Sequence, residues 1–173
     1  MDYKLTGIPA DSNGRMKCRS LLTLLLFLEW QIFSLSAETV MVTVHRNMTQ
    51  WEILSAVEGG AMEVLFDAGY IVFNSLGGNS SGIFPSIEDF KAAREGGASL
   101  LLALEVEASP PSPSEPLLPL SVRYELFLVA DRQVLVRGII EKGEIPRSEG
   151  EQWEQYADRW GREAAERTVK GLR

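Results

Sequence analysis

The fold is decided by residues 64–73, which read Val-Leu-Phe-Asp-Ala-Gly-Tyr-Ile-Val-Phe. Gly69 is expected to end a helix as its C′ residue, and Ile71–Phe73 to form a short strand. Within the helix, Gly59-Gly60 predicts a close packing contact or a kink. Apolar side chains ahead of the stretch recur every three or four residues and form the stripe of this helix: Trp51, Leu54, Val57, Ala61 and Leu65.

The pattern on either side predicts two further helices and four further strands. Helices are expected to begin at Thr49–Glu52, Ser86–Asp89 and Ser148–Glu151, and the first and last of these carry the capping-box pattern. In the short middle helix Phe90 and Ala93 face inward, with Ile87 as a further candidate. The five strands cover residues 40–44, 71–73, 99–106, 122–129 and 134–140.

The resulting order is β-α-β-α-β-β-β-α. Its two β-α-β passes favour parallel neighbouring strands, and its closing hairpin, which turns at Asp131-Arg132, adds antiparallel ones. The run Ser99–Val106 begins apolar on both faces, which indicates a central strand covered on both sides. We therefore expect a single α/β domain over residues 38–173, with one mixed sheet of about five strands and helices packed on it.

Residues 1–37 have the layout of a leader with a secretory signal peptide. Basic residues precede the apolar run Leu21–Leu28, and the small residues Ser34, Ser36 and Ala37 follow it. Cleavage is expected near Ser36/Ala37, and Met16 is a second candidate for the true start. The alternatives are an inner-membrane anchor retained over residues 21–33, which Glu29 and Gln31 interrupt, or a buried helix of the domain.

Charge and cysteine content restrict the class of protein. The whole chain has a formal net charge of −7, and residues 1–37 hold four basic and three acidic side chains, so the remainder carries −8. This acidity argues against nucleic acid and anionic membrane surfaces as partners. The only cysteine, Cys18, lies in the leader, and with one histidine the domain lacks the usual zinc ligand sets, so we expect no metal and no cofactor.

Few residues are candidates for catalysis. Every histidine-dependent triad would need His45, the only histidine, for which a hydrogen-bonded structural role is favoured. The carboxylate pairs Glu105/Glu107 and Glu141/Glu144 have the chemistry of general acids and bases, but in an acidic chain we expect them to be solvated. The loop Gly77–Gly82 lies where backbone amides bind anions, yet it lacks a P-loop lysine, and its role stays open.

The segment 108–120 is rich in proline. Pro110, Pro113, Pro116 and Pro119 recur at intervals of three, the turn length of a polyproline II helix. As partner-binding residues they would form a preformed strip for an aromatic-lined groove. The favoured alternative is a long solvated connection between two strands.

Three parts of the chain together resemble a known family. They are the helix end Val64–Tyr70 with the strand Ile71–Phe73, the helix end Ala92–Ser99 with the strand residues Leu100–Leu102, and the closing hairpin and helix. The family is the small periplasmic α/β domain of bacterial envelope proteins, found in the curli secretion channel family, flagellar FlgO-type proteins and lipoprotein activators of penicillin-binding proteins. Those proteins are typically lipoproteins, whereas no cysteine follows the apolar run here. The resemblance implies a fold order and no catalytic residues.

These observations lead to one principal expectation and two alternatives. The principal one is a periplasmic or secreted, non-enzymatic envelope protein that binds other envelope proteins or copies of itself, with membrane contact only through an uncleaved leader. The second is a small secreted hydrolase that uses His45 or carboxylates such as Glu105. The third is a protein anchored in the inner membrane by residues 21–33.

Overall fold

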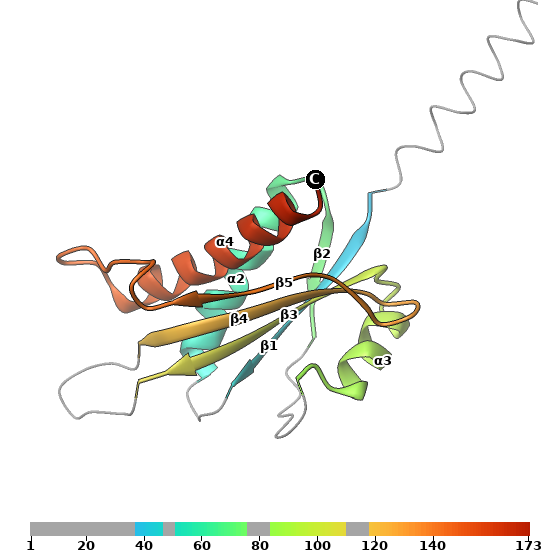
Figure 1. Cartoon of the computed structure of the whole chain (residues 1–173), viewed down its shortest axis with the longest axis horizontal. Coiled ribbons are helices and arrows are strands. Elements are labelled where there is room, and N and C mark those ends of the chain that lie inside the picture. Colours follow the sequence, from blue (N-terminus) through green and yellow to red (C-terminus); the bar gives the residue numbers. More distant parts are fainter. Residues whose placement is uncertain (1–36, 47–50, 76–83, 110–117) are drawn as a thin grey trace, which may run out of the picture. The chain divides into compact units, whose positions relative to one another are not determined.

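One five-stranded sheet, in the order β2-β1-β3-β4-β5, organises the chain (Figure 1). The computed structural model describes residues 37–46, 51–75, 84–109 and 118–173. The pairs β1–β2 and β1–β3 are parallel, and the pairs β3–β4 and β4–β5 are antiparallel. The elements are β1 (Thr39–Arg46), α2 (Trp51–Asp67), β2 (Ile71–Asn74), α3 (Ile87–Glu95), β3 (Leu100–Ala108), β4 (Pro119–Leu128), β5 (Gln133–Glu141) and α4 (Trp153–Gly171).

The predicted fold class is confirmed, including the element order and the mixed sheet. The chain crosses the sheet in one direction from β1 to β2 and in the other from β2 to β3. Two crossovers of the same hand that run in opposite directions place their helices on opposite faces. Accordingly, α2 and α4 contribute to the core on one face, and α3 contributes to the core on the other.

The two cores follow from the alternation of side chains along the strands. On β1, Val40 and Val42 face α2 and α4, whereas Met41 faces α3. The central strand β3 is buried on both faces over its first five residues, as predicted for a strand covered on both sides. The core on the α3 side is the smaller one, and its buried members are Met41, Phe90, Ala93, Ala98, Leu101, Ala103, Phe127 and Val129.

Glycine allows α2 and α4 to cross in close contact. A Cβ on Gly60 would overlap the backbone carbonyl of Asp158, and one on Gly161 would overlap that of Val57. A Cβ on Gly59 would meet nothing within 4 Å. The close packing contact predicted for the Gly59-Gly60 pair is therefore made by Gly60.

Two local predictions were wrong. Ser148 and Glu151 do not cap α4, because they close a turn ahead of it, in which the Ser148 N–H donates to Glu151 Oε2 over 2.9 Å. Ile87 does not face inward but is 67% exposed. At the start of α3 the inward position is taken by Asp89, which forms a capping box with Ser86.

Several sequence-based expectations lie outside the described residues. All of the expected leader except Ala37 is among them, and so is the capping signal at Thr49. The others are the loop Gly77–Gly82 and the prolines Pro110, Pro113 and Pro116. Pro119 is described: it is the first residue of β4, is buried, and pairs with Ala108. The ladder thus brackets the proline-rich segment at both ends.

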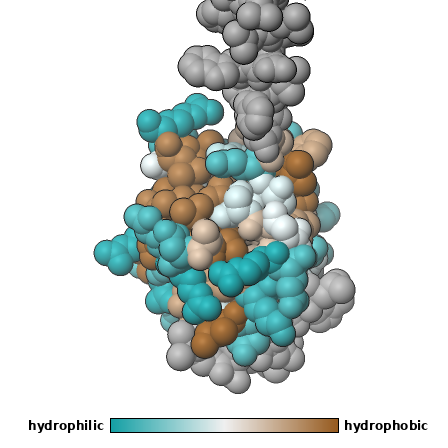
Figure 2. Space-filling model, turned by 90° about the vertical axis from the view of Figure 1, so that its right-hand side faces the viewer, coloured by the Kyte–Doolittle hydropathy of each residue, from teal (hydrophilic) through white to brown (hydrophobic). Residues whose placement is uncertain are grey.

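Apolar side chains also reach the surface. Figure 2 shows apolar patches interrupted by hydrophilic side chains on one face of the molecule. In the part of the chain that is described, no helix is both long and apolar enough to cross a membrane. The exposed large apolar residues are Phe66, Ile71, Ile87, Val134, Leu135, Ile139 and Leu172.

Candidate functional site at the carboxyl ends of β1 and β3

The topology marks one place on the sheet. The chain leaves β1 toward β2 and leaves β3 toward β4, so its connections diverge between these neighbouring strands. In open α/β sheets, ligands bind outside the carboxyl ends of strands at such a switch point. His45 pairs with Glu105 there, and Glu105 pairs with Arg123 on β4. Because opposed residues share a face, the three side chains form one polar row.

His45 is held in a buried polar cluster beneath the start of α3. Its Nε2 lies 2.9 Å from Asp89 Oδ2, and the two side chains are 6% and 5% exposed. The Ser86 hydroxyl and the Ser86 N–H also donate to Asp89 Oδ2, over 2.8 and 2.7 Å. Thr43 Oγ1 donates to Asp89 Oδ1 over 3.3 Å. The cluster therefore ties α3 to β1 through one carboxylate.

The geometry of the cluster differs from that of a catalytic triad. In a Ser-His-Asp triad the carboxylate and the nucleophile contact different ring nitrogens of the histidine. Here Asp89 and the Thr43 hydroxyl, at 3.4 Å, both approach Nε2. The Ser86 hydroxyl donates to the carboxylate. The arrangement is that of a buried polar tie between two elements.

The protonation of Asp89 reflects competing influences. Burial is the largest of them and would by itself raise the pKa of this carboxyl group. Hydrogen bonds from His45 and Ser86, together with the charge of His45, outweigh burial and bring the pKa of Asp89 below its ordinary value. The carboxylate is therefore the stable form at neutral pH.

An aromatic contact joins this cluster to the next residue of the row. The ring of Phe84 meets the His45 ring edge-on, with 5.4 Å between centroids. The Arg123 guanidinium carbon lies 4.4 Å from the Phe84 centroid, a cation–π distance. Arg123 Nη2 is 3.1 Å from Glu105 Oε2, so this guanidinium is already paired with a carboxylate. Its Nε is buried and makes no hydrogen bond among the described residues, but it lies 3.8 Å from Glu125 Oε1, within ion-pair distance.

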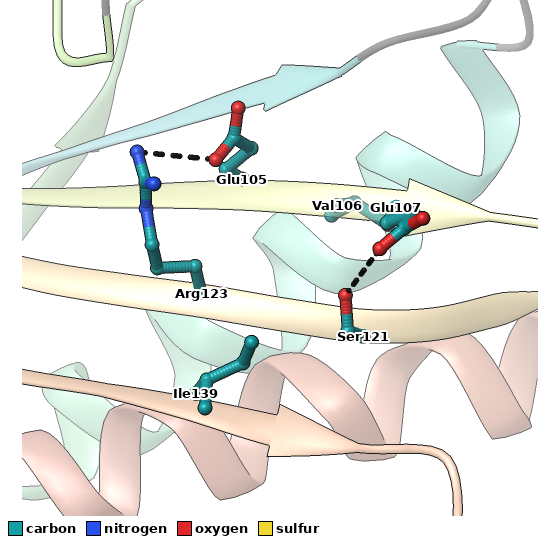
Figure 3. A pocket seen from close by; sticks show the side chains of 6 residues that line it. All are labelled: Glu105, Val106, Glu107, Ser121, Arg123 and Ile139. Carbon is teal, nitrogen blue, oxygen red and sulfur yellow. Dashed lines mark hydrogen bonds and ion pairs between the residues drawn. The ribbon is translucent and has the colours of Figure 1, made fainter.

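Beside Arg123 the surface is hollowed (Figure 3). The hollow has a volume of about 300 Å³, at the small end for ligand pockets. Figure 3 shows two polar pairs in it: Glu105 points toward Arg123, and the Ser121 hydroxyl donates to Glu107 Oε2 over 3.0 Å. Ile139 of β5 supplies an apolar wall. The six lining residues are Glu105, Val106, Glu107, Ser121, Arg123 and Ile139.

The structure brings together some of the residues singled out from the sequence and separates others. His45 and Glu105 lie in one row, and Glu105 and Glu107 line one hollow. The pair Glu141/Glu144 lies at the end of β5, where the Glu141 N–H donates to Glu144 Oε1 over 2.9 Å. Among the described residues no group of three His, Cys, Asp or Glu side chains could hold a metal ion.

Sequence reasoning missed most members of this site, among them Phe84, Asp89, Ser121 and Arg123. Asp89 had a local signal, because it stands three residues after Ser86 as in a capping box. Ser121 and Arg123 had a topological signal, since they lie on the strand next to the switch point. Phe84 had none that we can identify.

Comparison with known proteins gives weak likenesses. No protein-family model matches the chain, and no curated protein sequence matches it. Among solved structures, the PelC dodecamer of Paraburkholderia phytofirmans is 14% identical, with 78% of this chain and 86% of that chain covered and a TM-score of 0.47. Lipoprotein GNA1162 of Neisseria meningitidis is 16% identical, with 60% and 80% covered and a TM-score of 0.45.

A third solved structure, hypothetical protein CT253 of Chlamydia trachomatis, is 13% identical, with 79% of this chain and 98% of that chain covered and a TM-score of 0.47. All three come from bacteria, and one of them is a lipoprotein. With such identities and TM-scores, these likenesses assign neither a family nor a function to this chain.

Proposed function

We propose that this chain is an exported, non-enzymatic protein-binding module of the bacterial cell envelope, and that it contacts its partner through the open edge of β5. The observation that carries the proposal is the exposure of three large apolar side chains on this edge strand: Val134 and Leu135 at 39% and Ile139 at 49%. Edge strands usually avoid such exposure because an unpaired edge pairs readily with another chain.

The occupant we propose is an extended segment of a partner protein that adds to the sheet beside β5. In this mode backbone hydrogen bonds hold the added strand, and apolar side chains on alternate positions select it. At Glu141 the edge is closed, because its N–H donates to the Glu144 carboxylate and its carbonyl accepts from the Glu144 N–H. Glu144 is fixed in turn by Arg167 of α4. The added strand would therefore lie along Gln133–Ile140, on both sides of the register shift at Leu135.

Two observations support a binding role over the alternative of a hydrolase. The Nε2 of His45 faces Asp89 in a buried site. Glu105 is paired with Arg123. His45 and Glu105, two of the candidates for acid/base chemistry, are therefore engaged in structural contacts. Export itself is proposed from the leader.

The test is site-specific photo-crosslinking in intact cells. A photoreactive residue at Leu135 is expected to give a discrete adduct in the envelope fraction, and the added substitution Ile139→Lys should abolish it. Ile87→Lys is the matched control, since Ile87 is exposed on α3, away from β5. The proposal is contradicted if no adduct forms at Leu135 or if the adduct survives Ile139→Lys. Recovery of the protein in the cytoplasm would also contradict it.

A further inference from the structure

The hollow over β3, β4 and β5 combines features that single out one class of ligand. Its lining comes from the carboxyl-terminal part of β3 and from the antiparallel strands β4 and β5. It is small, one wall is the exposed Ile139, and two carboxylates project into it from alternate positions of the same strand. The site thus offers an apolar surface beside negative charge.

The charges of the two carboxylates are not equally compensated. Glu105 is paired with the Arg123 guanidinium at 3.1 Å. Glu107 receives only the neutral Ser121 hydroxyl, and no basic side chain among the described residues pairs with it. The lining therefore carries one carboxylate charge in excess. On the other side of Ser121, Glu141 of β5 is its strand partner, and this third carboxylate makes the surroundings of the hollow more negative.

An anion is disfavoured in this place for the same reasons. The only cation in the lining, Arg123, already has Glu105 on its Nη2 and the Phe84 ring against its guanidinium. Its Nε is buried, so it is not open to a ligand in the hollow. A cation placed there would gain the Glu107 carboxylate as a charge-assisted hydrogen-bond acceptor.

We propose that this hollow binds a primary ammonium group with a short aliphatic stem, the ammonium on Glu107 and the stem against Ile139. A lysine side chain of a partner protein and a small free alkylamine share this chemistry. The inference does not rest on strand addition at β5, because Glu107 carries it, and Ile139 is a residue that the two proposals share.

Nuclear magnetic resonance titration of the purified protein at low salt tests the inference. Butylammonium and Nα-acetyl-lysine N-methylamide are the probes, and butyrate and butanol are the matched anionic and neutral controls. We expect saturable shifts of the amides of residues 105–107 and 121 with the amines only. If the lysine derivative binds more tightly than butylammonium, the source is a protein side chain, and the reverse order indicates a free amine.

Two substitutions are expected to change the affinity for the amine in opposite directions. Glu107→Gln should weaken amine binding about tenfold, because a charge-assisted hydrogen bond is lost. Arg123→Gln should strengthen it, because Glu105 is released as a second acceptor. Glu166→Gln on the exposed face of α4 is the control and should leave binding unchanged.

The opposite pattern, with butyrate binding that Arg123→Gln abolishes, would overturn the inference in favour of an anion site. Shifts that do not saturate, or that are equal in the wild type and in Glu107→Gln, would show that the amine binds as an adventitious ion only, which would overturn the inference. If Arg123→Gln fails to fold, Glu107→Gln together with the comparison of butylammonium and butyrate decides the question. If the wild type binds neither amine although the β5 adduct forms, this inference is overturned and the proposed function still stands.

Discussion

Gly161 of α4 lies directly against the backbone carbonyl of Val57 in α2, with no room for a Cβ between them. In the neighbouring contact the roles are exchanged, because Gly60 of α2 lies against the backbone carbonyl of Asp158 in α4. Backbone atoms cannot move aside as the end of a flexible side chain can. The distance between the two helices is therefore set by these two glycines.

Gly161→Ala is expected to lower the free energy of unfolding by about 1–3 kcal/mol, because the added methyl group overpacks the helix crossing. Gly59→Ala is the matched control: its Cβ meets nothing, and alanine should raise stability by about 0.5–1 kcal/mol. Urea denaturation followed by circular dichroism measures both. Equal effects of the two substitutions would show that the crossing is not set by glycine.

Asp89→Asn should lower the free energy of unfolding at neutral pH by about 1–3 kcal/mol, since the bonds that Asp89 accepts from His45 and Ser86 lose their charge. Glu88→Gln, at an exposed neighbouring position of α3, is the control and should change little.

The ionisation of Asp89 is expected to make the stability of the fold depend on pH. The pKa of this carboxyl group is lower in the folded protein than its ordinary value, so its ionisation stabilises the fold above the unfolded pKa of about 3.9. This stabilisation is lost as the pH falls through the folded pKa. Wild type should therefore lose stability more steeply than Asp89→Asn in acid. Parallel denaturation curves of the two proteins between neutral pH and pH 2 would contradict the assignment.

Tyr156→Phe should cost about 1–2 kcal/mol of stability. The buried Tyr156 hydroxyl donates to the Ile145 carbonyl over 3.0 Å, and its removal leaves that carbonyl without the bond. Tyr70→Phe is the control, because no hydrogen bond of the Tyr70 hydroxyl is seen within the described part of the chain. Thermal unfolding of both variants is the measurement, and similar midpoints would refute the expected difference.

The leader predicts a specific mature terminus. Amino-terminal sequencing of the exported protein should begin near Ala37, because small residues at Ser34, Ser36 and Ala37 follow the apolar run at a distance typical of cleavage. A product that retains Leu21–Leu28 would instead support the anchored alternative, and carbonate extraction would then keep it with the membranes.

The fold could be predicted from the sequence because its signals are local. The spacing of apolar residues before Gly69 and the β-branched run after Tyr70 lie within a few turns of each other, and both hold in the structure. Ile87 was misassigned because the capping box turns Asp89 inward and leaves Ile87 in solvent. The boundary at Ser148 was misassigned because the same residue pattern also closes an isolated turn.

The candidate site was harder to predict, because its contacts join distant residues. His45 and Asp89 are 44 positions apart, and neither position alone indicates a partner. Phe84 reaches Arg123 only because the segment that leads into α3 packs against the end of β1. The row His45, Glu105 and Arg123 depends on strand register, which composition does not determine.

The pairing of Ala108 with Pro119 makes the segment between them a permissive insertion point. One register shift separates that pair from the regular ladder that begins at Glu107 and Ser121, and the Ser109 N–H donates to the Leu118 carbonyl over 2.9 Å. Lengthening a closed loop costs only about 0.6 kcal/mol for each doubling. An epitope tag introduced between these residues should therefore leave the sheet intact and allow the protein to be located in the cell without altering either terminus.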